Sequence, residues 1–268
     1  MSHSHSLPNT RRWHSVAALA LFSLAACDSS TGPGTSAQIR MAAPAVVGQS
    51  TAAGGGLSIT GTNGTLVITD IKVIVNEFEL SRPETSDCDD DVSSSGSGTC
   101  GSFETKYFVA DVPLGTGAVT VANDRIPAGT YSGMEFEVKD LEVDDGDAKD
   151  SANAARINAL LAELRTTYAN WPARASMMIE GTFTPTGGVA QPFRVYFDAE
   201  LEVETTFLTP VLIDATSSGV TIDLRPDLWF KNGDGTVRNL ALSHCSTVCS
   251  LVEFELEMEG GFEIELDD

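Results

Sequence analysis

The chain has 268 residues, of which 20% are charged, and its acidic side chains outnumber the basic ones to give a formal net charge of −22. Such an acidic protein is a poor ligand for nucleic acid or anionic lipid, because both require Lys and Arg to neutralise their phosphate groups. The length predicts one folded domain, or two at most.

The N-terminal segment has the features of an export signal. Arg11 and Arg12 precede an apolar run over 16–26 that is too short to span a bilayer, which needs about 20 apolar residues. The residues Leu24-Ala25-Ala26-Cys27 resemble the lipobox of bacterial lipoproteins, in which the cysteine is acylated and becomes the mature N-terminus. The resemblance implies that residues 1–26 are removed. Lipid on Cys27 would then anchor the protein in the cell envelope, on the periplasmic or outer face of the inner or the outer membrane. An ordinary signal peptide with an incidental cysteine is the alternative.

The segment 27–56 is rich in Ser, Thr, Gly, Ala and Pro and has few large side chains. Such a composition cannot bury enough apolar surface to offset its ordering entropy, so we expect a flexible tether. Without residues 1–26 the chain keeps 14 basic and 38 acidic side chains, a net charge of −24, and the single histidine His244.

Four cysteines remain besides Cys27, and in an exported chain an even number favours disulfides. Of the three possible connectivities we prefer Cys88–Cys100 with Cys245–Cys249, because each bond closes a short local loop. A zinc site made by His244, Cys245 and Cys249 is the alternative, although it lacks a sure fourth ligand.

Alternation with a period of two residues predicts strands between 57 and 268. The pattern is longest over 195–207, where apolar side chains occupy nearly all odd positions and acidic ones the even positions 198 to 204. Changes of phase predict one bulge near 76–77 and another near 139–140, because one extra residue in a strand shifts the alternation.

The C-terminal sequence EFELEMEGGFEIEL predicts a hairpin. A three-residue turn over 259–261 keeps the apolar residues on one face and pairs Phe254 with Leu266. One long strand kinked at the glycines is the alternative. If these strands neighbour 195–207, like charges stand opposite one another and destabilise the sheet. The glutamates concerned are Glu200, Glu202, Glu204, Glu255, Glu257, Glu263 and Glu265.

One amphipathic helix is predicted, beginning at a cap formed by Asp150 or Ser151 and ending before Asn170 and Pro172. Its apolar stripe consists of Ala154, Ile157, Leu160, Leu161, Leu164 and Tyr168. Many short strands with one helix predict a mainly β protein, an antiparallel β-sandwich of the immunoglobulin-like or transthyretin-like type. We expect a single domain over 57–268, with the helix covering an open end of the sandwich.

Three stretches resemble a family of uncharacterised bacterial lipoproteins with a β-sandwich domain of unknown function. They are TDIKVIVNEFEL (69–80), IPAGTYSGMEFEV (126–138) and DLRPDLWFKNGDGTV (223–237). The resemblance covers about 57–237 and implies an exported, anchored sandwich without catalytic residues. The cysteine pair and the acidic C-terminal segment depart from the polar helix and Asp-rich tail in which that family often ends.

The usual catalytic motifs are missing from the sequence. It contains no Gly-x-Ser-x-Gly, no His-Glu-x-x-His and no phosphate-binding loop, and any catalytic histidine after export must be His244. We therefore expect no enzymatic activity. A glycoside hydrolase with paired carboxylates stays an alternative because carboxylates are abundant.

Calcium is the one cofactor that the sequence suggests. The acidic stretch 144–150 supplies Asp144, Asp145, Asp147 and Asp150, and hard oxygen ligands of this kind suit Ca²⁺. Two further candidates are DCDDD (87–91) and NGDG (232–235), although a tight turn is the simpler interpretation of NGDG. None of the three matches the spaced EF-hand loop.

These observations predict a non-catalytic binding or structural module with an envelope protein or a glycan as its partner. The alternative is a calcium-assisted carbohydrate-binding or adhesion module. Trp229 and Phe230 beside NGDG are its only candidate aromatics, and core packing is the commoner role for such residues in a sandwich.

Overall fold

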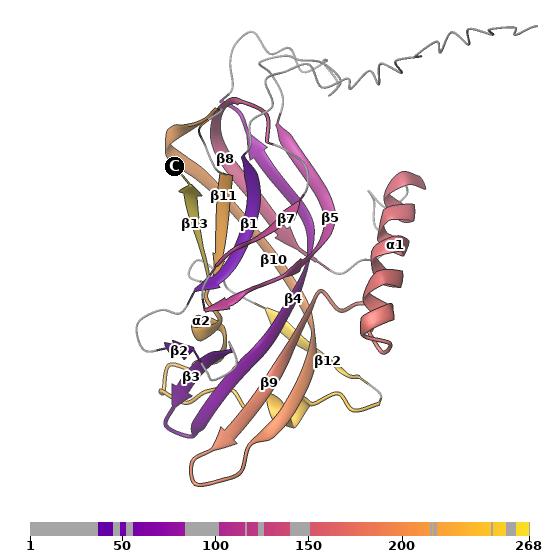
Figure 1. Ribbon diagram of the computed structural model, residues 1–268, viewed down its shortest axis with the longest axis vertical. Helices are drawn as coiled ribbons and strands as arrows, with labels where there is room; N and C mark the ends of the chain where they lie inside the picture. Colours follow the sequence, from indigo (N-terminus) through magenta and orange to yellow (C-terminus); the bar gives the residue numbers. More distant parts are fainter. Residues whose placement is uncertain are drawn as a thin grey trace, which may run out of the picture. The chain divides into compact units, whose positions relative to one another are not determined.

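The computed structural model describes residues 37–44, 49–51, 56–83, 102–115, 117–122, 126–139, 151–214, 216, 219–247, 249–255 and 261–267. These residues form a mainly β protein with two sheets and two α-helices, which confirms the predicted class (Figure 1).

The larger sheet has eight strands and is antiparallel except where β12 runs parallel to β10. Its strands are β2 (Gln49–Thr51), β3 (Leu57–Gly61), β4 (Gly64–Ser81), β5 (Phe103–Asp111), β8 (Gly129–Val138), β9 (Met177–Pro185), β10 (Gln191–Ile213) and β12 (Leu251–Glu255). The smaller sheet has five strands, namely β1 (Gln38–Pro44), β6 (Leu114–Gly115), β7 (Val119–Ala122), β11 (Gly219–Leu224) and β13 (Phe262–Asp267). The helices are α1 (Ser151–Thr167), α2 (Pro226–Phe230) and the 3₁₀ helix η2 (Leu240–Ser243).

Two long strands, β4 and β10, organise the larger sheet. β9 begins at Met177, which lies opposite Val73 of β4 and Phe197 of β10. β8 ends at Val138, which pairs with the next part of the same two strands. β9 and β8 therefore lie end to end between β4 and β10, and the chain between them has to leave the sheet.

Ser176 fills the break between β8 and β9. Its carbonyl accepts a hydrogen bond from Ile74 N at 2.8 Å, and its N–H donates to Phe197 O at 3.0 Å. Its hydroxyl accepts from Ala199 N at 2.7 Å, and the residue is fully buried. The side chain thus takes the place of a missing strand residue, because a buried N–H without a partner is costly.

The predicted bulge near 76–77 is confirmed. Val75 pairs with Val138 and Glu77 with the adjacent Glu137, so Asn76 is the extra residue of β4. The Asn76 side-chain amide donates to the Glu137 carboxylate. This extra residue explains why Phe78 continues the buried face in the opposite phase. The second predicted bulge falls on Asp140, which lies outside the described residues.

The prediction of a flexible tether over 27–56 is wrong for residues 38–44 and 49–51. Residues 38–44 form β1, which lies between β11 and β7 in the smaller sheet, and Ile39, Met41 and Ala43 are fully buried. Residues 49–51 form β2. The prediction relied on the composition of the whole segment, and so it missed the short alternation of Ile39, Met41 and Ala43.

The predicted C-terminal hairpin is also wrong. β12 pairs parallel with β10, so that Phe254 lies opposite Ala199. β13 pairs antiparallel with β11 in the smaller sheet, where Leu266 lies opposite Val220. Alternation fixes which face of a strand is apolar, but it does not choose the strand edge with which that strand pairs.

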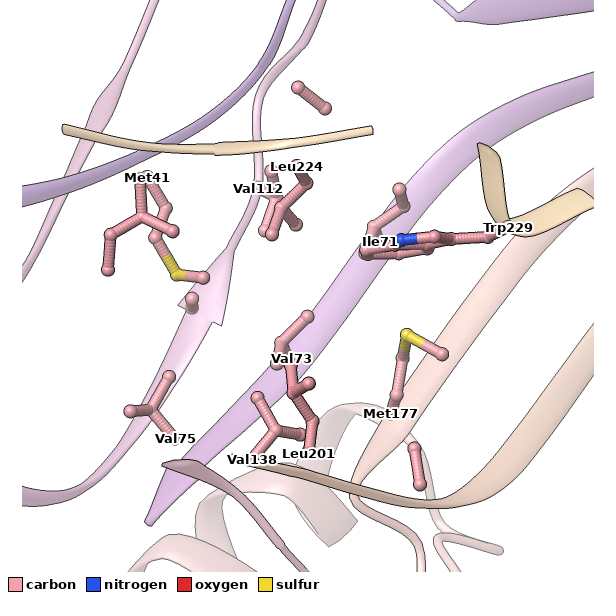
Figure 2. Close-up of a cluster of buried hydrophobic side chains, with 14 of the residues drawn as sticks. Met41, Ile71, Val73, Val75, Val112, Val138, Met177, Leu201, Leu224 and Trp229 are labelled. Atoms are coloured by element: carbon pink, nitrogen blue, oxygen red, sulfur yellow. The ribbon is translucent and has the colours of Figure 1, made fainter. Parts of the chain in front are cut away.

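Apolar side chains from both sheets meet in one hydrophobic core. Figure 2 shows Met41 and Leu224 of the smaller sheet in the same cluster as Val73 and Val138 of the larger sheet. Burial of each such aliphatic side chain contributes about 1.5–3 kcal/mol. Burial in this core explains why the inward-facing residues of β4, β8, β9 and β10 are apolar.

Candidate functional site on the outer face of the large sheet

The face of the larger sheet that points away from this core, here called the outer face, carries the most distinctive chemistry of the described chain. Ile74, Met178 and Tyr196 alternate with core residues along β4, β9 and β10 and belong to a second buried cluster. Tyr196 is only 1% exposed, although it shares the even positions of β10 with the acidic residues 198 to 204.

Helix α1 covers part of the outer face. Its bounds and its apolar stripe agree with the prediction, and Ile157, Leu161 and Leu164 are buried against the second cluster. The expectation that the helix covers an open end of a sandwich is wrong. The helix follows β8 and precedes β9, and the break between these strands lies in the middle of the sheet (Figure 1).

Polar side chains form a network where α1 ends. The Tyr168 hydroxyl donates to Asp70 Oδ2 at 2.9 Å. Lys72 Nζ lies 2.6 Å from Asp70 Oδ1 and also contacts the Asp111 carboxylate. Arg194 lies 5.4 Å above the Tyr168 ring and forms an ion pair with Glu180, the cross-strand neighbour of Asp70. Each carboxylate of this network has a cation beside it.

The electrostatics of this network favour a structural role, in which it holds the end of α1 against the larger sheet, over a role in proton transfer. Burial, together with the hydrogen bond and the charge of Asp70, raises the pKa of Tyr168 to about 12, so the phenol stays a donor at neutral pH. Burial lowers the pKa of Lys72, but the hydrogen bonds to Asp111 and Asp70 outweigh it and the net direction is upward. Neither group is poised near neutral pH as a general base or nucleophile requires.

The outer face also carries four carboxylates in adjacent register positions of β5, β4, β8 and β10, here called the acidic row. Glu79 of β4 lies opposite Glu104 of β5 on one side and Glu135 of β8 on the other, and Glu135 lies opposite Glu204 of β10. All four side chains reach the surface, either exposed or half-buried. Like charges in directly opposite positions destabilise a sheet.

A neighbouring register row is partly neutralised. Glu77 lies opposite Lys106 and Glu137, and Glu137 lies opposite Glu202. Lys106 forms ion pairs with Glu77, at 3.1 Å, and with Glu104. Lys106 therefore offsets part of the repulsion at the β5 edge.

The expected juxtaposition of glutamates is confirmed in one place and corrected in others. Glu200 lies opposite Glu255, as anticipated for neighbouring strands. Glu202 and Glu204 instead face glutamates of β8, a strand that the prediction did not consider. Glu263 and Glu265 lie in the smaller sheet with β13, and Glu257 is outside the described residues.

Of the predicted disulfides, Cys245–Cys249 is present, with its Cα atoms 4.7 Å apart. Sulfur atoms joined in a disulfide cannot bind zinc as thiolate ligands. The Nδ1 atom of His244 accepts a hydrogen bond from Arg194 N at 2.9 Å. Cys27, Cys88 and Cys100 lie outside the described residues.

The principal calcium candidates, Asp144, Asp145, Asp147 and Asp150, are outside the described residues, as is the stretch 87–91. Where the chain is described, no group of three or more His, Cys, Asp or Glu side chains is arranged to hold a metal.

The NGDG stretch forms a tight turn. Asp234 Oδ1 accepts hydrogen bonds from the hydroxyl of Thr236 at 2.6 Å and from its N–H at 2.8 Å. The same hydrogen bonds lower the pKa of Asp234. Asp234 Oδ1 thus already accepts two hydrogen bonds within the turn, both from Thr236.

The two candidate aromatics are buried. Trp229 is 8% exposed and Phe230 is fully buried, and both pack against Phe254 in the core. The indole N–H of Trp229 donates to Gly261 O at 3.2 Å. Neither ring offers a face on which a sugar could stack, and core packing was the role that the sequence favoured.

Comparisons with models of protein families, with curated proteins and with solved structures found no match for this chain. Of the helices in the described ranges, none has both the length and the apolar character required to cross a membrane.

Proposed function

We propose that this chain is a lipid-anchored, non-catalytic module of the bacterial cell envelope, which binds or supports an envelope partner through the outer face of its larger sheet. In this proposal the two sheets pack as a β-sandwich and the lipid is carried by Cys27. The family of uncharacterised lipoproteins that the sequence resembles would share this arrangement.

Two observations support export and the sandwich. The Cys245–Cys249 disulfide suits an oxidising compartment outside the cytoplasm. Tyr131, in the IPAGTY stretch, donates its hydroxyl to Pro127 O at 2.8 Å, four residues upstream. A comparable bond from a tyrosine to upstream backbone recurs in immunoglobulin-like sandwiches as the tyrosine corner.

The observation that carries the binding part of the proposal is the acidic row. Four glutamates in register repel one another, a cost that the ion pair between Lys106 and Glu104 lessens at the β5 edge. Surfaces kept for function are often built at the expense of stability. A basic segment of an envelope protein, or a divalent cation shared with a glycan, would match this charge.

The same geometry supports a non-catalytic role. Glutamates of the acidic row project from one side of one sheet, whereas the two carboxyl groups of a glycosidase flank the bond that is cleaved. The carbohydrate-binding alternative loses its aromatic candidates because Trp229 and Phe230 are buried.

The anchor is tested by expressing the full chain in a bacterium supplied with a fatty acid that carries a chemical tag. We expect the tag on the wild-type protein, which should sediment with membranes, and no tag on the Cys27→Ser variant. Serine preserves the size of the side chain but removes the thiol that accepts the lipid. An untagged wild-type protein in the cytosol would overturn the proposal.

A further inference from the structure

One end of the larger sheet exposes leucine side chains. Leu208 and Leu212, near the end of β10, are 105% and 63% exposed. The pairing with β8 moves from Thr206, opposite Gly133, to Val211, opposite Tyr131. Four residues of β10, among them Leu208, therefore face a single residue of β8 and lie outside the regular ladder.

The strand segments around these leucines carry no charge. Residues 205–213 of β10 and 126–134 of the segment that leads into β8 contain no Asp, Glu, Lys or Arg. The next residues, Glu204 and Glu135, belong to the acidic row. Arg82 is the charged side chain beside these segments, with its guanidinium donating to Ala128 O at 3.3 Å and lying 5.1 Å from the centre of the Tyr131 ring. Exposed leucines that flank segments without carboxylates differ from single apolar residues scattered on a surface, which are ordinary.

The N-terminal strand begins at this same end of the protein. Gln38, the first residue of β1, pairs with Gly219 shortly after β10 ends. Ala37 O accepts a hydrogen bond from Ile126 N at 3.3 Å, and Gly129, three residues later, pairs with Ile213. Figure 1 shows β1 starting and β10 ending at the end of the sheets that is uppermost in that view.

The chain between the proposed anchor and this end is short. Ten peptide units separate Cys27 from Ala37, and a fully extended chain of that length spans at most ~35 Å. A tether that continued to residue 56 would have let the folded part sit clear of the lipid headgroups. Because β1 begins at Gln38, a lipid on Cys27 keeps the leucine-bearing end within ~35 Å of the membrane and lets it reach the lipids.

We propose that Leu208 and Leu212 form a membrane-contacting tip that inserts between the lipids of the membrane in which the protein is anchored. The inference rests on the proposed lipid anchor and adds a second attachment to it. The absence of carboxylates from 205–213 and 126–134, with the positive charge of Arg82 beside them, limits repulsion from anionic headgroups. Transfer of leucine out of water favours insertion. The acidic row then lies just outside the membrane surface.

The lipidated full-length protein is placed in phosphatidylcholine vesicles whose acyl chains carry bromine near the headgroup. Bromine quenches tryptophan on contact, so Leu208→Trp should lose about half of its added emission if the tip reaches ~5–10 Å into the headgroup boundary. Leu212→Trp provides a second reporter should the first variant fold poorly, which its melting curve shows. The matched control is Val189→Trp, another exposed aliphatic position (78% exposed), in the turn at the opposite end of β10.

The outcomes separate the inference from the proposed function. A protein that lacks the fatty-acid tag and does not float with vesicles overturns the anchor. A tagged protein that floats, but in which the Leu208→Trp and Leu212→Trp signals are quenched no more than that of Val189→Trp, overturns the tip alone. A blue shift of the Leu208→Trp emission without quenching would assign the leucine to a contact between proteins and would equally refute the membrane contact.

Discussion

Tyr168, the residue directly after α1, adds a polar link between the helix and the larger sheet. Its hydroxyl donates to Asp70, its ring lies under Arg194, and it contacts Trp171 at a ring distance of 5.9 Å. Its position at the end of the apolar stripe was predicted from helical spacing, but its hydroxyl partner is 98 residues away in the sequence. Pairing over such a separation depends on the strand order.

Removal of this hydroxyl should change how stability depends on pH. The folded protein raises the pKa of Tyr168 from 10.0 to about 12, so between these values the folded state keeps a proton that the unfolded state releases. The contribution of the Tyr168 hydroxyl to the free energy of unfolding is fully present below pH 10 and is lost as the pH rises towards 12. Urea unfolding at pH 9 and pH 11 should therefore show a smaller alkaline loss in Tyr168→Phe than in the wild type.

Other groups with a raised pKa, such as Lys72 and Tyr196, remain in both proteins and so act as an internal control. An equal alkaline loss in wild type and Tyr168→Phe would show that Tyr168 is not the group responsible.

The acidic row is a property of four neighbouring strands. Each glutamate alone is an ordinary outward-facing residue of an alternating strand, and the repulsion arises only from the register of β5, β4, β8 and β10. Lys106 relieves part of this repulsion at the β5 edge, where it reaches both Glu77 and Glu104.

Neutralising the centre of the row should stabilise the protein. Glu79 lies between Glu104 and Glu135, so Glu79→Gln is expected to raise the free energy of unfolding by some tenths of a kcal/mol at low salt. The gain should shrink near 1 M salt, where the screening length falls to ~3 Å. Denaturant unfolding at low and high salt measures both effects.

Glu77→Gln is the matched control, two residues away on the same strand. Glu77 forms an ion pair with Lys106, so its neutralisation removes an attraction and should bring no gain. Equal stabilisation by both substitutions would mean that the effect reflects net charge and not the register of the row.

The molecule as a whole depends on β1, which lies in the smaller sheet and contributes to the shared core. β1 pairs with β11 on one side and with β7 on the other. Figure 2 shows Met41 of β1 in the core cluster. The folded part of the chain therefore starts before the boundary at residue 57 that composition predicted.

Truncating Met41 should destabilise the protein as a core mutation does. Met41 is fully buried, so Met41→Ala is expected to lose about 2–5 kcal/mol of unfolding free energy. Leu242→Ala, at a position that is 83% exposed, should change it by less than about 0.5 kcal/mol. Denaturant unfolding compares the two, and equal small effects would show that β1 is not part of the cooperative core.

The sequence by itself determined the features that depend on neighbouring residues. The alternation over 195–207, the bulge at Asn76 and the bounds of α1 follow from local period and phase. The Cys245–Cys249 bond closes a loop so short that proximity along the chain selects it.

Only the tertiary structure decided which strand edges meet. It placed β12 and β13 in different sheets, made residues 38–44 a core strand, set α1 on the outer face and brought the glutamates of the acidic row into register. Period and phase identify the apolar side of an element, and several pairings bury that side equally well. The choice among them is made by the packing of the whole core, which no short stretch of sequence specifies.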